Sequence, residues 1–118
     1  MKFNIFSLAF FALFTSSVAG AADAPPAFNQ CKACHKTVSG KNAVGPSLFG
    51  VYNAKAGYAE GYKYSTNLLN SGLTWDEANL SKFIMDPKGT VPGNKMAMHG
   101  IKKPGEVKDL IDYLKTLR

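Results

Sequence analysis

The C-terminal segment carries apolar side chains at the spacing of an α-helix. Five of them fall three or four positions apart and would share one helix face: Val107, Leu110, Ile111, Leu114 and Leu117. Pro104 is placed to open this helix, Glu106 would lie in its first turn, and Lys115 and Arg118 stand at its end. The pattern predicts a helix that starts at Pro104 and buries its apolar face.

Three further helices are predicted upstream. One begins at Thr74, whose hydroxyl could cap it while Glu77 reaches back, and it stops at Asp86-Pro87. A short helix runs from Ser65 to about Asn70. Another begins at Pro25 or Pro26 and runs through Cys34. Because no alternating strand pattern of useful length appears, the fold class is all-α, with about four to five helices.

The segments between these helices are long for a small domain. Residues 40–61 and 89–100 are rich in Gly, Pro and Asn. Loops of this length usually need something to lie on. The sequence therefore indicates a core that apolar side chains alone do not complete.

The N-terminus has the features of a secretory signal. Lys2 supplies a positive charge, residues 5–14 are almost wholly apolar, and small residues follow at 19–21. We expect a cleaved signal peptide at 1–21, cut after Ala21 or Ala22, and one domain at 22–118. An uncleaved membrane anchor over residues 3–22 is the competing interpretation. Export would place the domain outside the cytoplasm.

Composition and charge narrow the class of protein. The chain has 118 residues, 46% hydrophobic and 19% charged, which suits one globular domain. Fourteen Lys and Arg against eight Asp and Glu give a net charge of +6, which falls to +5 once Lys2 is removed. The lysines are dispersed and no groove-reading motif is present, so nucleic acid is not an expected partner.

The two cysteines carry the clearest chemical signal. Cys31, Cys34 and His35 form the C-x-x-C-H signature of covalent c-type haem attachment. On a helix, positions i, i+3 and i+4 share one face. Both thiols could then join one porphyrin while the adjacent imidazole reaches the iron.

Two other interpretations of these residues stay open. A dithiol/disulfide couple needs only the C-x-x-C part, but it usually belongs to a βαβ chain. A zinc site could use Cys31, Cys34, His35 and His99, although consecutive ligands fit tetrahedral coordination poorly.

Over essentially all of residues 22–118 the chain resembles the class I cytochrome c family, in particular the soluble bacterial members close to the mitochondrial-type carrier. Besides the C-x-x-C-H motif, the landmarks appear in order: Gly45-Pro46-Ser47-Leu48, Gly61-Tyr62-Lys63-Tyr64, Gly72-Leu73-Thr74-Trp75-Asp76-Glu77 and Pro92-Gly93-Asn94-Lys95-Met96. The resemblance implies the cytochrome c fold, with the helices wrapped around one covalently bound haem c.

The resemblance also implies the iron ligands. His35 would bind the iron through one ring nitrogen while the Pro46 carbonyl holds its other N–H. Met96 would be the sixth ligand, with Met98 and His99 as its rivals in the same loop. A thioether is a soft, neutral donor that raises the reduction potential, which suits an electron carrier with no catalytic residue.

Further residues would surround the haem. Trp75, Tyr62, Tyr64 and Asn94 are expected to donate to the propionates. The expected apolar wall consists of Leu48, Leu68, Leu80 and Phe83. The remaining tyrosines, at 52, 58 and 113, are taken as surface or packing residues.

The chain departs from the family pattern at three places. Phe83 stands where many relatives have a Tyr that hydrogen-bonds the thioether, and residues 54–57 lack an Arg that would support a propionate. The first helix lacks the usual Gly at its crossing with the terminal helix, where we expect packing on Leu110 and Tyr113.

The lysines acquire a role from the resemblance, which places five around the exposed haem edge: Lys41, Lys88, Lys95, Lys102 and Lys103. They would steer transient docking onto acidic surfaces of redox partners. The implied protein is a monomeric periplasmic carrier of single electrons in a respiratory chain, from a quinol-oxidising complex or dehydrogenase to an oxidase or other acceptor. The alternatives are a dedicated subunit of one dehydrogenase, a haem peroxidase-like enzyme and a thiol oxidoreductase.

Overall fold

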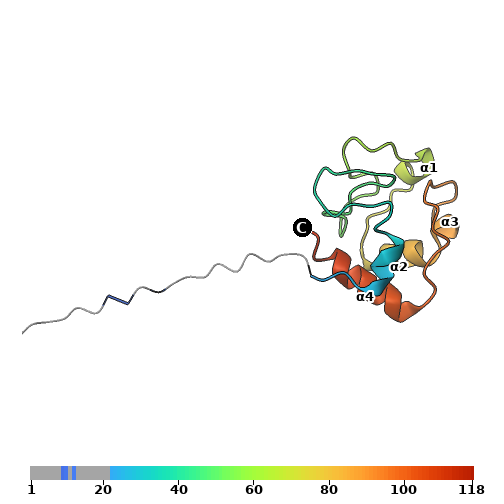
Figure 1. The fold of residues 1–118 in the computed structure, drawn as a ribbon. Helices are drawn as coiled ribbons and strands as arrows, with labels where there is room; N and C mark the ends of the chain where they lie inside the picture. Colours follow the sequence, from blue (N-terminus) through green and yellow to red (C-terminus); the bar gives the residue numbers. More distant parts are fainter. Residues whose placement is uncertain (1–8, 11, 13–21) are drawn as a thin grey trace, which may run out of the picture.

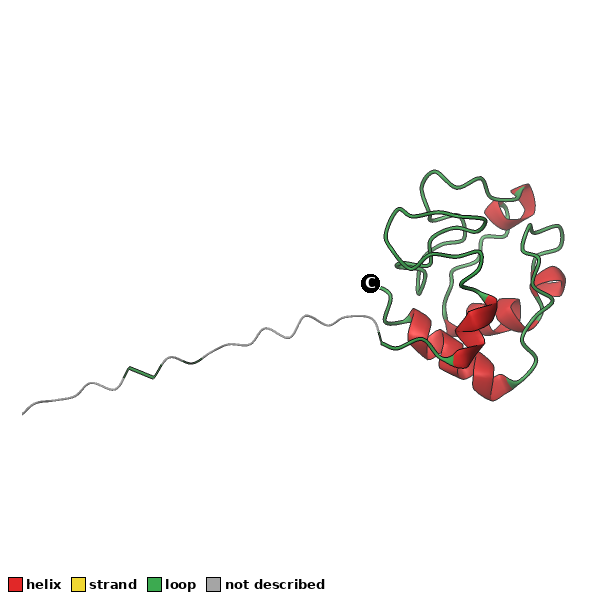
Figure 2. Cartoon of the chain, viewed as in Figure 1, coloured by secondary structure: helices red, strands yellow, loops and turns green. Residues whose placement is uncertain are grey.

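The computed structural model describes residues 9, 10, 12 and 22–118. In chain order, the helices are the 3₁₀ helix η1 (Pro26–Gln30) and the α-helices α1 (Thr66–Leu69), α2 (Glu77–Met85), α3 (Pro87–Thr90) and α4 (Pro104–Leu114). Within the described residues the sole strand-like pairing is one bridge between Lys55 and Thr74. The all-α prediction is confirmed (Figure 2).

The expected signal peptide, apart from residues 9, 10 and 12, lies outside the described residues. In the part of the chain that the structure describes, every helix is too short or too polar to cross a membrane.

Helix α4 forms the centre of the core. The five residues of its predicted apolar stripe are all buried, at 1–4% exposure. The helix itself ends at Leu114, and Leu117 reaches the core from the turn that follows. Complete burial of such a side chain is worth about 1.5–3 kcal/mol, so this one face contributes much of the stability.

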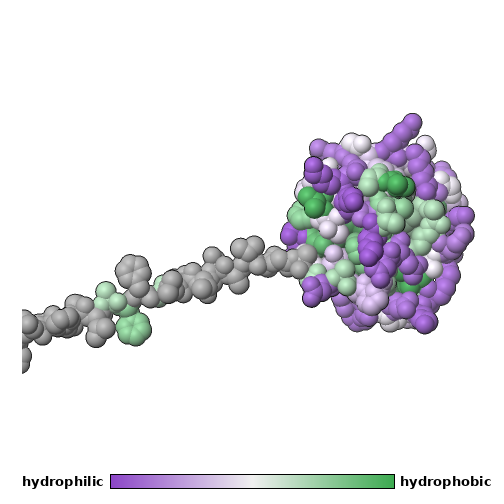
Figure 3. Space-filling model, in the orientation of Figure 1, coloured by the Kyte–Doolittle hydropathy of each residue, from purple (hydrophilic) through white to green (hydrophobic). Residues whose placement is uncertain are grey.

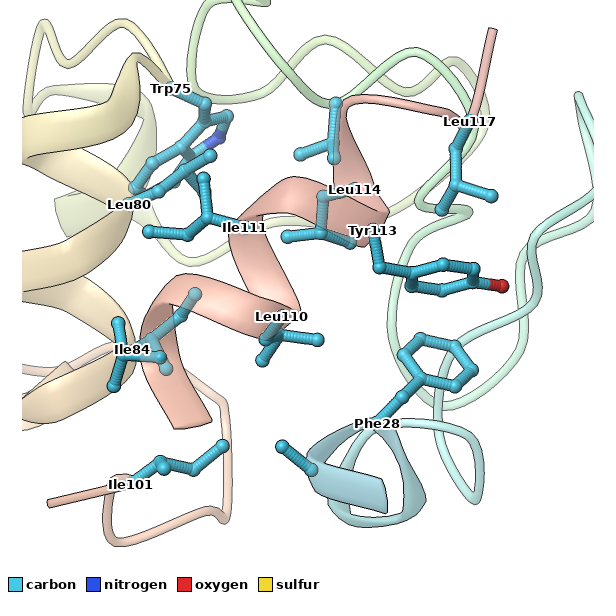
Figure 4. Close-up of a cluster of buried hydrophobic side chains, with 13 residues drawn as sticks. Phe28, Trp75, Leu80, Ile84, Ile101, Leu110, Ile111, Tyr113, Leu114 and Leu117 are labelled. Carbon is cyan, nitrogen blue, oxygen red and sulfur yellow. The ribbon is translucent and has the colours of Figure 1, made fainter. Parts of the chain in front are cut away.

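Two elements pack against α4 (Figure 4). From η1, the Phe28 ring meets the Tyr113 ring edge-on, with 4.9 Å between centroids. Leu110 belongs to the same buried cluster, so the packing predicted for the first helix is confirmed. Helix α2 contributes Leu80 and Ile84 from the other side.

The first helix is shorter than predicted. It is a single 3₁₀ segment that ends at Gln30, and residues 31–34 form turns. The backbone N–H of Cys31 donates to the Phe28 carbonyl at 2.8 Å. The helix therefore starts where predicted, at Pro26, and falls short at its C-terminal end.

The predicted cap of the helix after Trp75 is wrong. The helix begins at Glu77, and Asp76 caps it by accepting from the Asn79 N–H at 2.9 Å. The backbone that precedes this helix is hydrogen-bonded to another segment, since the Trp75 N–H donates to the Ala54 carbonyl at 2.7 Å. This pairing with residues 53–56 keeps Trp75 outside the helix, so the first helical N–H groups lie beyond the reach of the Thr74 hydroxyl. The helix does stop at Met85, and α3 follows it, capped by Asp86.

The long loops lie on the other side of the molecule from α4. In Figure 1 the segment between η1 and α1 arches over the upper part, while α2, α4 and η1 lie together below. Ser47, 3% exposed, holds this segment: its Oγ donates to the Val38 carbonyl at 2.7 Å and its N–H to Asn42 Oδ1 at 3.0 Å. The short helix α1 is confirmed, with Ser65 as its cap.

Candidate functional site

A cavity of about 540 Å³ lies between the helices and the loops. This volume is within the range of cofactor pockets. Its lining includes Cys31, Cys34, His35 and Met96, together with all the residues expected at the propionates and in the apolar wall; of the five expected docking lysines it includes Lys95. The four expected wall residues, Leu48, Leu68, Leu80 and Phe83, all face it.

The Cys-His motif is held in one turn. The N–H groups of Cys34 and His35 both donate to the Cys31 carbonyl, at 3.1 and 2.9 Å. Both thiols are free and half-buried at the cavity wall. Burial, with the neighbouring Cys34 as a smaller cause, raises the pKa of the Cys31 thiol to about 11. A redox dithiol needs a thiolate with a lowered pKa, and the burial of Cys31 works in the opposite direction.

The His35 imidazole is fixed in one tautomer. Its Nδ1 lies 2.7 Å from the Pro46 carbonyl, which only accepts, so Nδ1 carries the proton and Nε2 keeps a lone pair. Burial lowers the pKa of His35, while the bond to Pro46 partly opposes this. A neutral imidazole with a free Nε2 is the form that binds a metal.

Gly45 packs against the His35 imidazole so closely that there is no room for a side chain at this position. A Cβ on Gly45 would lie 2.7 Å from Nδ1 and 2.9 Å from Nε2 of His35, which is closer than real contacts allow. The Gly45 N–H donates to the Cys34 carbonyl at 2.8 Å, which ties this loop to the motif. Sequence analysis did not place Gly45 in the site. Its position directly before Pro46 was the available signal.

Trp75 and two tyrosines, Tyr62 and Tyr64, bring polar groups to the cavity lining. Tyr62 donates its hydroxyl to the Val44 carbonyl at 2.8 Å, and Tyr64 accepts from the Ala59 N–H at 2.9 Å. Trp75 is 5% exposed as a residue, and none of the hydrogen bonds among the described residues uses its indole N–H. Tyr64 and Trp75 therefore each have a donor available for a ligand in the cavity.

Tyr58, taken from sequence as a surface or packing residue, also lines the cavity. Its hydroxyl donates to the Ser47 carbonyl. Burial, with Tyr64 as a smaller cause, raises the pKa of Tyr58. Nothing in the local sequence separates Tyr58 from a surface tyrosine, because its partner lies in a distant loop.

Asn94 departs from its expected role. Its side-chain amide donates to the carbonyls of Pro87 and Val91, both at 2.8 Å, and its Oδ1 accepts from the Met96 N–H at 2.8 Å. The amide is thus engaged with backbone and not available to a propionate. Asn94 instead fixes the start of the segment that carries Met96.

The two rival ligands also reach the cavity. Met96, Met98 and His99 all appear in its lining. Met96 and Met98 are half-buried, and Met98 packs against the core cluster. His99 is exposed.

The zinc alternative lacks its ligand set. Across the described residues, no three His, Cys, Asp or Glu side chains lie close enough together to hold a metal ion.

The five expected docking lysines are all exposed: Lys41, Lys88, Lys95, Lys102 and Lys103. Among the residues that the structure describes, the ion pairs involve Lys108 and Lys115 and none of these five. Two of the five are tethered, since the Lys95 ammonium donates to the Lys63 carbonyl at 3.1 Å and that of Lys102 to the Met85 carbonyl. Hydrophilic side chains cover much of the face seen in Figure 3.

These residues fit a covalently held haem. The two thiols and the Nε2 lone pair of His35 meet at one wall of an apolar cavity, and a thioether lies on the loop that lines it. The bond to the Pro46 carbonyl sets the position of the His35 imidazole, and a Cβ at Gly45 would overlap the ring in that position. The donor set is that of a haem c with a histidine and a methionine as iron ligands.

Comparisons with known proteins point to one family. The family model described as Cytochrome c matches residues 21–118. A relative named cytochrome c2 iso-2 from Magnetospirillum fulvum is 58% identical over 96 residues, which cover 81% of this chain and all of that protein. A cytochrome c-550 from Nitrobacter winogradskyi is 49% identical over 75% of this chain and 82% of its own.

A solved structure agrees as well. Cytochrome cH from Methylobacterium extorquens superimposes with a TM-score of 0.72 and 55% identity, over 76% of this chain and 91% of that one. Proteins of this kind are electron carriers that bind haem c covalently, not enzymes. The chain belongs to the cytochrome c family.

Proposed function

We propose that this chain is a soluble periplasmic carrier of single electrons, from a quinol-oxidising complex or dehydrogenase to an oxidase or other terminal acceptor. The observation that supports it most is the cavity itself, whose lining contains both His35 and the loop that carries Met96. If His35 and Met96 both bound the iron of a haem held here, no place would be left on it for a substrate. A haem c bound there supplies one-electron chemistry between the ferrous and ferric states.

His35 and Met96 would set the redox properties. The Pro46 carbonyl holds the proton at Nδ1 of His35, so the ring keeps its orientation and Nε2 stays a donor to the iron. Asn94 places the Met96 backbone by accepting its N–H. A histidine and a methionine together favour a high potential.

The apolar wall residues would exclude water from the haem and so favour the ferrous state. Trp75 and Leu80 are buried, and Phe83 lies 4.9 Å from the Trp75 ring, centroid to centroid. Such an apolar wall excludes water, which lowers the local dielectric and disfavours the extra charge of the ferric state. We infer that the donors at Tyr64 and Trp75 serve the propionates.

The export signal supports a periplasmic location. The family match begins at residue 21, which agrees with a domain that starts where the expected signal peptide ends. The start of the mature chain can be read by mass spectrometry. An intact mass that includes Met1 would contradict cleavage.

The unpaired lysines support transient docking on acidic surfaces. Lys41, Lys88 and Lys103 have neither an ion pair nor a side-chain hydrogen bond among the described residues, so their charges are available to a partner. Small electron-transfer complexes are weak and sensitive to salt. Electrostatic steering by the whole charged surface raises association rates by roughly 10- to 1,000-fold.

An absorption spectrum tests the iron ligands. The ferric holoprotein should show c-type bands and the weak far-red band of methionine ligation, and Met96→Ala should lose the far-red band alone. Haem without that band in the wild type would favour a peroxidase-like enzyme. Absence of covalent haem would refute the proposal.

A salt series tests the docking surface. Electron transfer to an acidic partner should slow as ionic strength rises, and Lys88→Ala should slow it severalfold at low salt. Lys108→Ala is the matched control, because it removes the same charge from α4, where Lys108 is paired with Asp112 at 2.6 Å. Equal rates at low and high salt, or equal effects of the two variants, would contradict steering by these lysines.

A further inference from the structure

The chain contains two histidines, and both line the same cavity. His35 has a place in the proposed function and His99 has none. His99 lies three residues after Met96, on the same loop, and its side chain is exposed. A second imidazole so close to the expected methionine ligand is a potential donor to the same iron.

The loop that carries Met96 and His99 is anchored at both ends. At its start, the Asn94 amide and carbonyl oxygen make three hydrogen bonds with backbone groups. At its end, Ile101 is 2% exposed and its N–H donates to the Ile84 carbonyl at 2.9 Å, while the Lys102 ammonium donates to the Met85 carbonyl.

Between these anchors the backbone is held weakly. The amides and carbonyls of residues 97–100 make no hydrogen bond with any residue that the structure describes. Segments with few hydrogen bonds and exposed side chains rearrange at low free energy. The loop can therefore change its conformation without breaking either anchor.

The burial of successive side chains shows which change would be needed. Met96 and Met98 are half-buried, whereas Lys95, Ala97 and His99 are exposed. This alternation is typical of extended backbone, in which neighbouring side chains point to opposite sides. His99 lies on the exposed side of this segment but already borders the cavity, so a local turn of residues 97–100 would bring its imidazole to the place that the Met96 thioether leaves.

We propose that His99 is a second, alternative ligand for the haem iron, which replaces Met96 when the Met96 thioether leaves. This inference rests on the ligation by His35 and Met96 given above. The exchange breaks one iron–sulfur bond and forms one iron–nitrogen bond from an imidazole lone pair, with no net transfer of electrons. Because methionine raises the potential relative to a second imidazole, the exchange lowers the potential and removes the chain from its carrier role.

The test uses the ferric holoprotein with three changes. Met96→Ala removes the thioether, Met96→Ala with His99→Asn removes both donors, and Met96→Ala with Met98→Leu is the matched control. Spin state is read by electron paramagnetic resonance, and the midpoint potential and the affinity for added imidazole are measured.

Met96→Ala and the Met98 control should stay low-spin, with a potential below that of the wild type. The variant that lacks both Met96 and His99 should become high-spin. It should also bind imidazole at least about tenfold more tightly than Met96→Ala does. If His99 occupies about nine-tenths of the iron in Met96→Ala, the apparent affinity of that variant for imidazole is about tenfold weaker.

Identical spectra and imidazole affinities for Met96→Ala and the His99 double variant overturn the inference. A low-spin double variant, which points to another ligand such as Lys95, does so as well. The proposed function fails separately, if the wild type itself lacks the far-red methionine band.

Discussion

Gly45→Ala tests the support that the loop gives to His35. Gly45 is buried, and an added Cβ would overlap the imidazole at 2.7 Å from Nδ1 and 2.9 Å from Nε2. The ring cannot simply turn away, since its Nδ1–H is bonded to the Pro46 carbonyl. Overpacking of this kind costs about 1–3 kcal/mol, and loss of the hydrogen bond would add about 1 kcal/mol. We expect the free energy of unfolding of the holoprotein to fall by about 1–4 kcal/mol.

The assay is unfolding in guanidinium chloride, with the far-red band measured on the same samples. Gly105→Ala is the matched control, because nothing lies within 4 Å of its added Cβ. Gly105 lies in the first turn of α4, where alanine is favoured over glycine by up to about 1 kcal/mol. The reasoning is refuted if Gly45→Ala unfolds within about 0.5 kcal/mol of the wild type, or if the two variants lose stability equally.

Three further predictions concern the surroundings of the cavity. Asn94→Ala should weaken the methionine band and let added imidazole displace Met96 at lower concentrations, because the loop loses its first anchor; an unchanged titration would contradict this. A double-mutant cycle of Phe28→Leu and Tyr113→Leu should give a coupling of about 0.5–1.5 kcal/mol in unfolding experiments, and additive effects would deny the edge-on contact. Burial raises the pKa of Tyr58, so the folded state keeps a proton that the unfolded state loses, and stability should fall as pH rises above about 10. Tyr58→Phe should reduce that fall, as measured by thermal unfolding across alkaline pH, and an unchanged pH profile would contradict this.

The sequence predicts well those structural features that depend on residues close together in the chain. The apolar stripe of α4 is a local periodicity, and all five of its members are buried. The bond from His35 to Pro46 is present as the family resemblance implies, whereas residues 31–34 form turns where a helix was predicted.

The prediction is weaker where partners distant in sequence decide the outcome. Thr74 and Asp76 are both good caps, and the pairing of Trp75 with Ala54 selects Asp76. Asn94 could have faced the cavity, but the carbonyl of Pro87 lies within reach of its amide. Such choices depend on which backbone groups the fold leaves unpaired, and periodicity and spacing do not contain that information.

The cavity also bears on the order of events in assembly. Leu110 and Leu114 of α4 belong both to the buried core and to the cavity lining. A void of about 540 Å³ that nothing fills would cost on the order of 10 kcal/mol, as much as a whole domain of this size is worth. The polypeptide before haem attachment is thus expected to remain largely unfolded. Cys31 and Cys34, which line this cavity in the folded chain, would then be accessible for haem attachment before the fold closes around them.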